Sequence, residues 1–155
     1  MLSQQQTLPL SIHSELYNLL IPKDHLLRQI NDLIDFSFVY EELVSKYSPN
    51  NGRRAECPIR LFKYLLLKVI YDLSDVDIVM HSRYDLSYKY FLGMVPEEDV
   101  IDPSTLTKFR KLRLKDLELL DMLIGKTVAI AIDKGIIKSN SIIVDATHSG
   151  SRSNP

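Results

Sequence analysis

The chain has 155 residues, of which 45% are hydrophobic and 25% charged, a composition typical of a soluble globular protein with one ordinary core. Its 19 Lys and Arg residues are balanced by 20 Asp and Glu residues, which excludes a broadly basic surface and leaves only a local patch for nucleic-acid binding. The single cysteine, Cys57, excludes an internal disulfide, and the lack of a secretory signal or a membrane-length apolar stretch favours the cytoplasm.

The N-terminal third of the sequence predicts an arm, two helices and a loop. Residues 1–21 are polar and then mixed, which is typical of a loosely packed arm. Beyond Pro22, apolar side chains recur at helical spacing over residues 26–34, and Asp24 is suited to begin that helix. A second short helix is expected over residues 38–47, and the turn formers in SPNNGRRAECP then predict an exposed loop.

Two further helices are marked by capping and turn residues. Pro58 stands where a first helical residue is favoured, and apolar residues recur over residues 62–73 at i, i+3, i+4, i+7, i+8 and i+11. Ser74, with an acid three residues later, has the pattern of a capping box that opens a short helix through Tyr84. The segment SYKYFLG follows, and its Gly93 predicts a stop.

The last part of the sequence predicts a long helix and then a strand. Asp102 can cap a helix that Pro103 opens, and this helix is expected to continue to Gly135 with a bend near Gly125. The run SIIVD, residues 141–145, is rich in β-branched residues and is typical of a buried strand that ends at an acid. The predicted fold class is therefore mainly α, a multi-helix domain with one C-terminal β-strand.

Two clusters of basic residues could neutralise DNA phosphates. The first is KFRKLRLK, residues 108–115, in which three lysines share one side of the predicted helix and apolar residues occupy another. The second is spread over the loop and the first turn of the helix that begins at Pro58, a favourable place for phosphate contacts. Solvated surface positions are the alternative for both clusters. The candidate DNA-binding residues are Arg53, Arg54, Arg60, Lys63, Lys108, Arg110, Lys111, Arg113 and Lys115.

Between these clusters, short helices joined by tight connections are compatible with a helix-turn-helix module, although most helical bundles share this arrangement. The aromatic residues Tyr84, Tyr88, Tyr90 and Phe91 could stack on bases, but we expect them to pack in the core. A helical domain that binds duplex DNA has little need of base stacking.

Asp145, at the end of the predicted strand, is the residue best suited to metal chemistry. A carboxylate at a strand end is held rigidly, and Mg²⁺ requires oxygen ligands in near-octahedral geometry. Two-metal phosphoryl transfer needs several converging carboxylates, however, and no Asp or Glu follows Asp145. On the pattern alone, a turn residue is the alternative.

Five segments resemble, in order and spacing, the transposases of bacterial insertion sequences that carry a DDE triad. They are IPKDHLLRQINDLIDFSFVYEEL, YSPNNGRRAECPIRLFKYLLLKVIYDLSDVDIV, YKYFLGM, DPSTLTKFRKLRL and IIVDATHSGSRSN. The resemblance implies an arm over residues 1–21, then a helical domain over residues 22–135 that holds double-stranded DNA at the transposon ends. It implies that residues 141–155 begin an RNase H-like domain. In the intact enzyme Asp145 would be the first catalytic acid and a Mg²⁺ ligand.

Two departures from the family pattern limit these implications. In GRRAECP, relatives usually have a proline directly after the Gly-Arg pair. The family's second Asp and final Glu lie beyond Pro155, so we expect no DNA cleavage or joining by this chain alone. Two alternatives stay open. One is a DNA-binding regulator derived from a truncated transposase, and the other is a protein-interaction module with residues 117–132 as its seam. A second copy or intact transposase would be the partner, and no membrane is expected.

Overall fold

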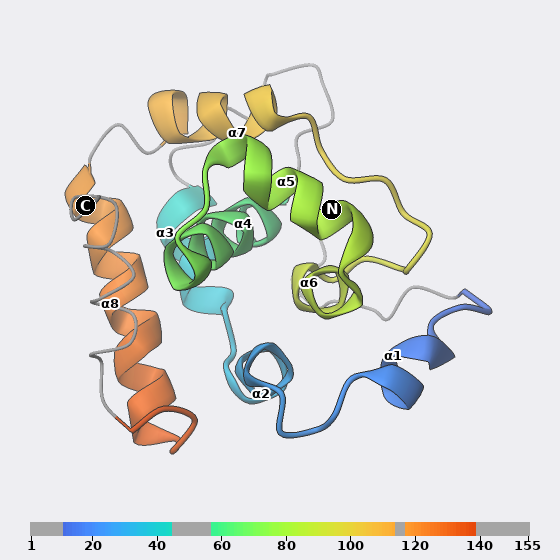
Figure 1. The fold of residues 1–155 in the computed structure, drawn as a ribbon. Helices are drawn as coiled ribbons and strands as arrows, with labels where there is room; N and C mark the ends of the chain where they lie inside the picture. Colours follow the sequence, from blue (N-terminus) through green and yellow to red (C-terminus); the bar gives the residue numbers. More distant parts are fainter. Residues whose placement is uncertain (1–10, 45–56, 114–116, 139–155) are drawn as a thin grey trace, which may run out of the picture.

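The structure is a computed structural model that describes residues 11–44, 57–113 and 117–138. These residues form helices and connecting segments, with no strand among them, which confirms the mainly α fold class (Figure 1). The strand predicted at residues 141–145, and with it the start of an RNase H-like domain, lies outside the described residues. The elements are α1 (Glu15–Leu20), α2 (Leu26–Leu33), α3 (Ser37–Val44), α4 (Pro58–Tyr71), α5 (Asp75–Tyr84), α6 (Leu86–Leu92), α7 (Pro103–Lys108), the π-helical turn η1 (Phe109–Arg113) and α8 (Leu117–Asp133).

Helix α4 is the centre of the fold (Figure 1). It begins at Pro58 as predicted, because the fixed φ and missing N–H of proline suit the first helical position. Every residue from there to Leu67 except Arg60 is buried, and α4 contacts α3, α5, α6 and α7. A helix enclosed by neighbours can be apolar around most of its circumference, which explains why α4 departs from a simple one-sided pattern.

Three aromatic rings join the helices around α4. Phe36, which precedes α3, lies with its ring centroid 6.3 Å from that of Phe62 in α4 and 6.3 Å from that of Phe91 in α6. Phe62 and Phe91 are completely buried. Aromatic pairs at such separations contribute about 0.5–1.5 kcal/mol beyond their buried area, so this cluster fixes α3, α4 and α6 relative to one another.

The predicted N-terminal caps of two helices are confirmed. The Ser74 hydroxyl accepts a hydrogen bond from a backbone N–H in the first turn of α5 at 3.1 Å, and the Asp102 carboxylate does the same for α7 at 2.8 Å. Each cap satisfies a backbone donor that has no partner within its helix. Helix α2 differs from the prediction, since His25 rather than Asp24 is its N-cap and accepts through Nδ1.

Glycines end α6 and α8, as the sequence predicts. Gly93 and Gly135 have φ of 77° and 76°, a left-handed conformation that glycine adopts without steric cost. In each case the N–H of the next residue donates back to a carbonyl of the last helical turn, at 3.0 Å after Gly93 and 2.8 Å after Gly135. This is the Schellman arrangement. Asp72, the C-cap of α4, also has a left-handed backbone conformation, with φ of 55°.

The long helix predicted over residues 103–135 is divided. Helix α7 passes into the π-helical turn η1 at Phe109, and α8, which begins at Leu117, runs in a different direction from α7 (Figure 1). Helix α8 continues without interruption through Gly125, where the sequence predicts a bend, to Asp133.

The described part of the N-terminal arm is more ordered than the sequence suggests. Residues 15–20 form α1, and Tyr17 and Ile21 are 7% and 5% exposed. The Tyr17 hydroxyl donates to the carbonyl of Met94. Arg28 of α2 is buried and donates to the carbonyls of Tyr17 and Ile21 at 3.2 and 2.7 Å. These contacts attach α1 to α2 and α6.

Candidate nucleic-acid interface

The basic cluster at the end of α7 presents two lysines to solvent. Lys108 and Lys111 are exposed, whereas Leu106 and Phe109 of the same segment are 0% and 3% exposed. The segment is therefore amphipathic, as its sequence predicts. Lys115 and the side chain of Arg113, which belong to the same predicted cluster, lie outside the described part of the chain.

Arg110, from the middle of that cluster, faces Asp75 of α5. Its guanidinium forms an ion pair with the Asp75 carboxylate, which also accepts a hydrogen bond from Thr107 at 2.9 Å and pairs with Lys68 at 3.1 Å. The Asp75 side chain is 15% exposed. These four residues, the Asp75 cluster, join α4, α5 and the α7–η1 segment through one carboxylate.

The Asp75 carboxylate is kept charged by its partners. Burial by itself would raise its pKa, but hydrogen bonds from Thr107, Lys68 and Arg110 together hold the pKa of Asp75 below its ordinary value. The cluster anchors α7 against α5, so Lys108 and Lys111 project from a fixed segment. The sequence did not predict this arrangement, because Thr107 and Arg110 are 32 and 35 residues from Asp75.

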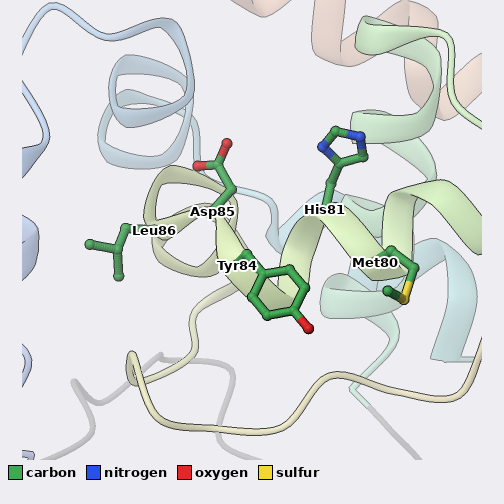
Figure 2. A pocket seen from close by; sticks show the side chains of 5 residues that line it. All are labelled: Met80, His81, Tyr84, Asp85 and Leu86. Carbon is green, nitrogen blue, oxygen red and sulfur yellow. The ribbon is translucent and has the colours of Figure 1, made fainter.

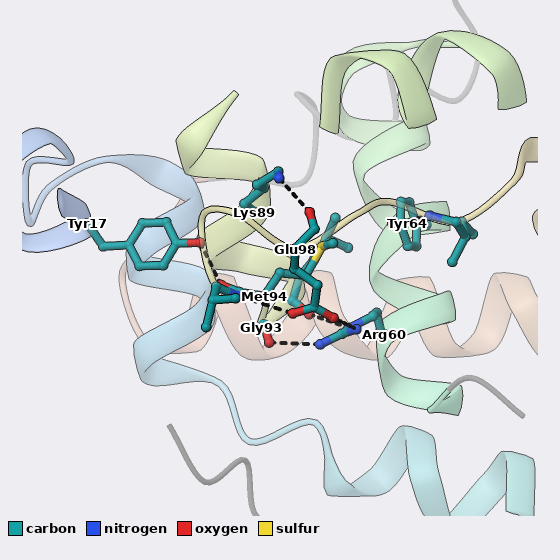
Figure 3. Close-up of polar contacts among 10 residues, drawn as sticks. Tyr17, Arg60, Tyr64, Lys89, Gly93, Met94 and Glu98 are labelled. Carbon is teal, nitrogen blue, oxygen red and sulfur yellow. Dashed lines mark hydrogen bonds and ion pairs between the residues drawn. The ribbon is translucent and has the colours of Figure 1, made fainter. Parts of the chain in front are cut away.

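Arg60 is used inside the fold, although its sequence position suggested a phosphate contact (Figure 3). Its guanidinium donates to the carbonyls of Leu92 at 2.9 Å and Gly93 at 2.8 Å, and it pairs with the Glu98 carboxylate at 3.0 Å. The side chain is 23% exposed. Because these donors already bind protein oxygens, Arg60 belongs to the framework of the segment after α6 and not to the interface.

Lys89 of α6 holds the same segment from the other side (Figure 3). It is 6% exposed, and its ammonium donates to the carbonyls of Pro96 at 2.8 Å and Glu98 at 2.6 Å. The Glu98 carboxylate in turn accepts from the Val95 N–H at 3.2 Å. Side chains of α4 and α6 thus fix the non-helical connection that leads the chain to α7.

Lys63, the other predicted phosphate ligand in α4, lies in the core and is 5% exposed. Its ammonium donates to the Asn31 side-chain oxygen at 2.7 Å and lies 5.0 Å from the ring centroid of Phe36 and 5.1 Å from that of Phe91. Burial lowers the pKa of Lys63 to about 8. An enclosed ammonium cannot reach a phosphate, so Lys63 is a core residue.

Lys63→Met is expected to raise the free energy of unfolding at pH 7 by about 1–2 kcal/mol, because it removes a buried charge and preserves volume. The pKa of Lys63 is about 8 in the folded chain and 10.5 ordinarily, so the unfolded chain binds more protons between these values. The free energy of unfolding of the wild type therefore rises with pH between about 8 and 10.5. Over the same range, the difference in that free energy between Lys63→Met and the wild type decreases. Urea denaturation at neutral and alkaline pH measures this, with Lys134→Met on the exposed end of α8 as the control. A variant less stable than wild type at pH 7 would contradict the expectation.

Helices α5 and α6 are joined by a single residue, Asp85, whose carboxylate caps α6 by accepting from the Ser87 N–H at 2.8 Å. Beside this junction lies an open depression of about 630 Å³. Figure 2 shows the side chains that line it, which are Met80, His81, Tyr84, Asp85 and Leu86.

The aromatic residues of this region divide between core and surface. Tyr88 and Phe91 are 7% and 0% exposed, as expected for core residues. Tyr90 is half-buried, and its hydroxyl donates to Asp32 at 2.6 Å. Tyr84 differs from the prediction, since it is 78% exposed. Its position at the last residue of α5 directs it away from the core.

The remaining predicted site residues, Arg53, Arg54 and Asp145, lie outside the described residues. Across residues 11–44, 57–113 and 117–138, no group of three or more His, Cys, Asp or Glu side chains is placed to hold a metal ion. Mg²⁺ binding at Asp145 thus stays a prediction. Within the same ranges, none of the helices combines the length and apolar character that crossing a membrane requires.

Comparison with known families matches residues 15–112 to the family described as transposase domain (DUF772). The match covers more than half of the chain and includes the Asp75 cluster, Lys108 and Lys111. Comparisons with curated proteins and with solved structures gave no match. The predicted resemblance to insertion-sequence transposases is confirmed at this level: the chain belongs to the transposase domain (DUF772) family.

Proposed function

We propose that this chain binds double-stranded DNA through the exposed lysines of α7 and η1, as the part of a transposase that recognises transposon ends. The observation that carries the proposal is that Lys108 and Lys111 project from a segment anchored by the Asp75 cluster. The family membership supports this proposal, because a transposase must bind DNA before it can transpose that DNA.

An anchored segment suits phosphate binding for two reasons. Lysines on a fixed helix lose less conformational freedom on binding than lysines on a loop, so more of the electrostatic attraction is retained. The ion pair between Arg110 and Asp75 also reduces the repulsion that this partly buried acid would exert on a phosphate. We include Arg53, Arg54, Arg113 and Lys115 as proposed additional phosphate contacts.

The proposal assigns no cleavage step to this chain. Asp145 is proposed as the first catalytic acid and a Mg²⁺ ligand of the intact enzyme, where further carboxylates would be needed to hold the metal ions. The DNA-binding role of the helical region is independent of that assignment, since it depends on basic side chains of that region and not on Asp145.

The charge reversal Lys108→Glu/Lys111→Glu tests the proposal. We expect it to lower DNA affinity by more than about tenfold and to reduce the slope of log affinity against log salt by about 2, because each lost phosphate contact reduces that slope by about 1. Fluorescence anisotropy with a labelled duplex carrying an end of the element measures both quantities. A shuffled duplex of the same composition separates sequence recognition from general phosphate binding.

A matched control is Lys23→Glu/Lys138→Glu, which changes the net charge equally at two exposed lysines outside the proposed interface. This control should keep most of the affinity and the salt slope. Equal losses in the two double variants would show that net charge alone is responsible, and no loss in either would remove the proposed interface. Circular dichroism verifies that both variants remain helical.

The alternative of an interaction module with residues 117–132 as its seam has lost its main support. The apolar face of α8 is used within the chain, since Leu123, Ile124 and Val128 are 0%, 7% and 7% exposed. The ammonium of Lys126 in the same helix lies 4.9 Å from the ring centroid of Phe38 in the first turn of α3. The part of α8 that packs inward is therefore occupied by the chain's own core, while Met122 and Ile132 of the same helix are 45% and 37% exposed.

A further inference from the structure

The outer face of α5 carries an apolar stripe that the described part of the chain leaves exposed. Val76, Met80 and Tyr84 are 56%, 44% and 78% exposed. Residues four apart follow one side of a helix, so the three side chains form a continuous row. The row continues into the depression beside α6, which Met80 and Tyr84 line (Figure 2). Apolar side chains gathered in this way, unlike scattered ones, mark a contact surface.

Charges flank the stripe with opposite signs at its two ends. Asp77 lies in the acidic first turn of α5, whereas His81 and Arg83 lie in its basic last turn, and all three are exposed. Asp77 precedes Met80 by three residues and Arg83 follows it by three. The acidic end and the basic end of the exposed face therefore lie on opposite sides of Met80.

We infer that a second copy of this chain covers the stripe, with the two α5 helices antiparallel and a two-fold axis near Met80. In that arrangement Met80 meets Met80 of the second copy, and Val76 faces Tyr84 of the second copy. The acidic start of each helix comes level with the basic end of the other. Such self-complementarity is what a two-fold interface requires, and antiparallel helix dipoles add to the attraction.

This surface is separate from the proposed DNA-binding segment. Asp75, which holds α7, lies on the inner side of α5 together with the buried Ile78 and Val79. Pairing through the outer face leaves Lys108 and Lys111 exposed. A DNA contact through the stripe is less favoured, because Asp77 would repel phosphates and Val76 has nothing to donate. The inference does not depend on the proposed function.

The pairing is expected to be weak. One short helix from each copy buries less surface than the about 800 Å² per partner of a standard stable interface. The dissociation constant of the dimer is therefore expected to be micromolar or higher. Sedimentation equilibrium of the full chain, from low micromolar to the highest soluble concentration, should show a reversible increase in mass toward the dimer. A constant monomer mass over this range would overturn the inference.

Met80→Asp places like charges at the two-fold axis and is expected to weaken the association by more than about tenfold. The matched control is Met122→Asp on α8, because Met122 is 45% exposed and Met80 is 44% exposed. The control should dimerise as wild type does. If both variants dimerise normally, or if Met80→Asp weakens DNA binding without changing the mass, the stripe does not pair with a second copy.

A charge exchange provides a rescue test. Asp77→Arg alone and Arg83→Asp alone should each weaken the dimer, because each places like charges level with one another. The double variant Asp77→Arg/Arg83→Asp should restore dimerisation, since it exchanges the signs on both copies. Loss of the dimer in the double variant, with the helical spectrum retained, would contradict antiparallel pairing.

Cross-linking tests the position of the axis. In a Cys57→Ser background, Met80→Cys should form a disulfide-linked dimer under mild oxidation, because the two-fold axis brings each residue 80 opposite its counterpart. Met122→Cys in the same background should remain monomeric on a non-reducing gel. Equal cross-linking at both positions would indicate random collision instead of a defined interface.

Discussion

Lys89→Met is expected to lower the free energy of unfolding by about 2–4 kcal/mol. The wild-type ammonium binds the carbonyls of Pro96 and Glu98 from a site that is 6% exposed. Methionine fills the volume but cannot donate, so both carbonyls lose a charged donor. The connection between α6 and α7 then loses its attachment to α6. Urea denaturation at pH 7 measures the change.

Lys134→Met is the control for this experiment, because Lys134 is exposed after the end of α8 and the chemical change is the same. It should alter the free energy of unfolding by less than about 0.5 kcal/mol. An equally small change in the free energy of unfolding for Lys89→Met would show that the hydrogen bonds of Lys89 do not hold the connection between α6 and α7. The role assigned to Lys89 would then be wrong.

Asp75→Ala is expected to lower the free energy of unfolding by about 1–3 kcal/mol and to loosen α7 selectively. It leaves Arg110 and Lys68 without their carboxylate, and it leaves Thr107 with only the more distant Pro103 carbonyl as an acceptor, at 3.3 Å. The lower part of the range allows for the partial exposure of Lys68 and Arg110, whose side chains are 28% and 32% exposed. Hydrogen exchange should increase most in residues 103–111.

The control is Asp77→Ala, which removes an exposed acid from the same first turn of α5 and so has a similar effect on the helix dipole. It should leave exchange in α7 unchanged. Because the folded pKa of Asp75 is below its ordinary value of 3.8, its contribution is present above pH 3.8 and is lost as the pH falls through the folded value. The stability difference between wild type and Asp75→Ala should therefore narrow in acid. A difference that stays constant at all pH values would show that the charge of Asp75 does not hold α7.

The helix ends could be predicted from the sequence because their causes are local. Ser74 and Asp102 cap from within one turn, and Gly93 and Gly135 supply the left-handed residue that ends a helix. The division of the last helix could not be predicted, because KFRKLRLK has good helical character throughout. The π-helical turn at Phe109 has no marker in the residues themselves.

The candidate interface was only partly predictable. Periodicity identified Lys108 and Lys111 as a polar face. Arg60 and Lys63 were predicted as phosphate contacts for a different reason, their position in the first turn of a helix. Helix α4 is surrounded on most sides, so its polar residues turn inward and find partners there. The partners of Arg60 lie 32, 33 and 38 residues away, and no local pattern indicates contacts of that kind.

The Asp75 cluster also has an evolutionary consequence. Asp75 is the one acid of the cluster, and it contacts two cations from separate segments of the chain, Lys68 in α4 and Arg110 in η1. Loss of either cation leaves a one-to-one ion pair, whereas loss of Asp75 leaves two partly buried cations without their carboxylate. Drift at these positions is therefore coupled through the acid: related sequences that lack it are expected to differ at the two cations as well, whereas the exposed Lys108 and Lys111 carry no such constraint.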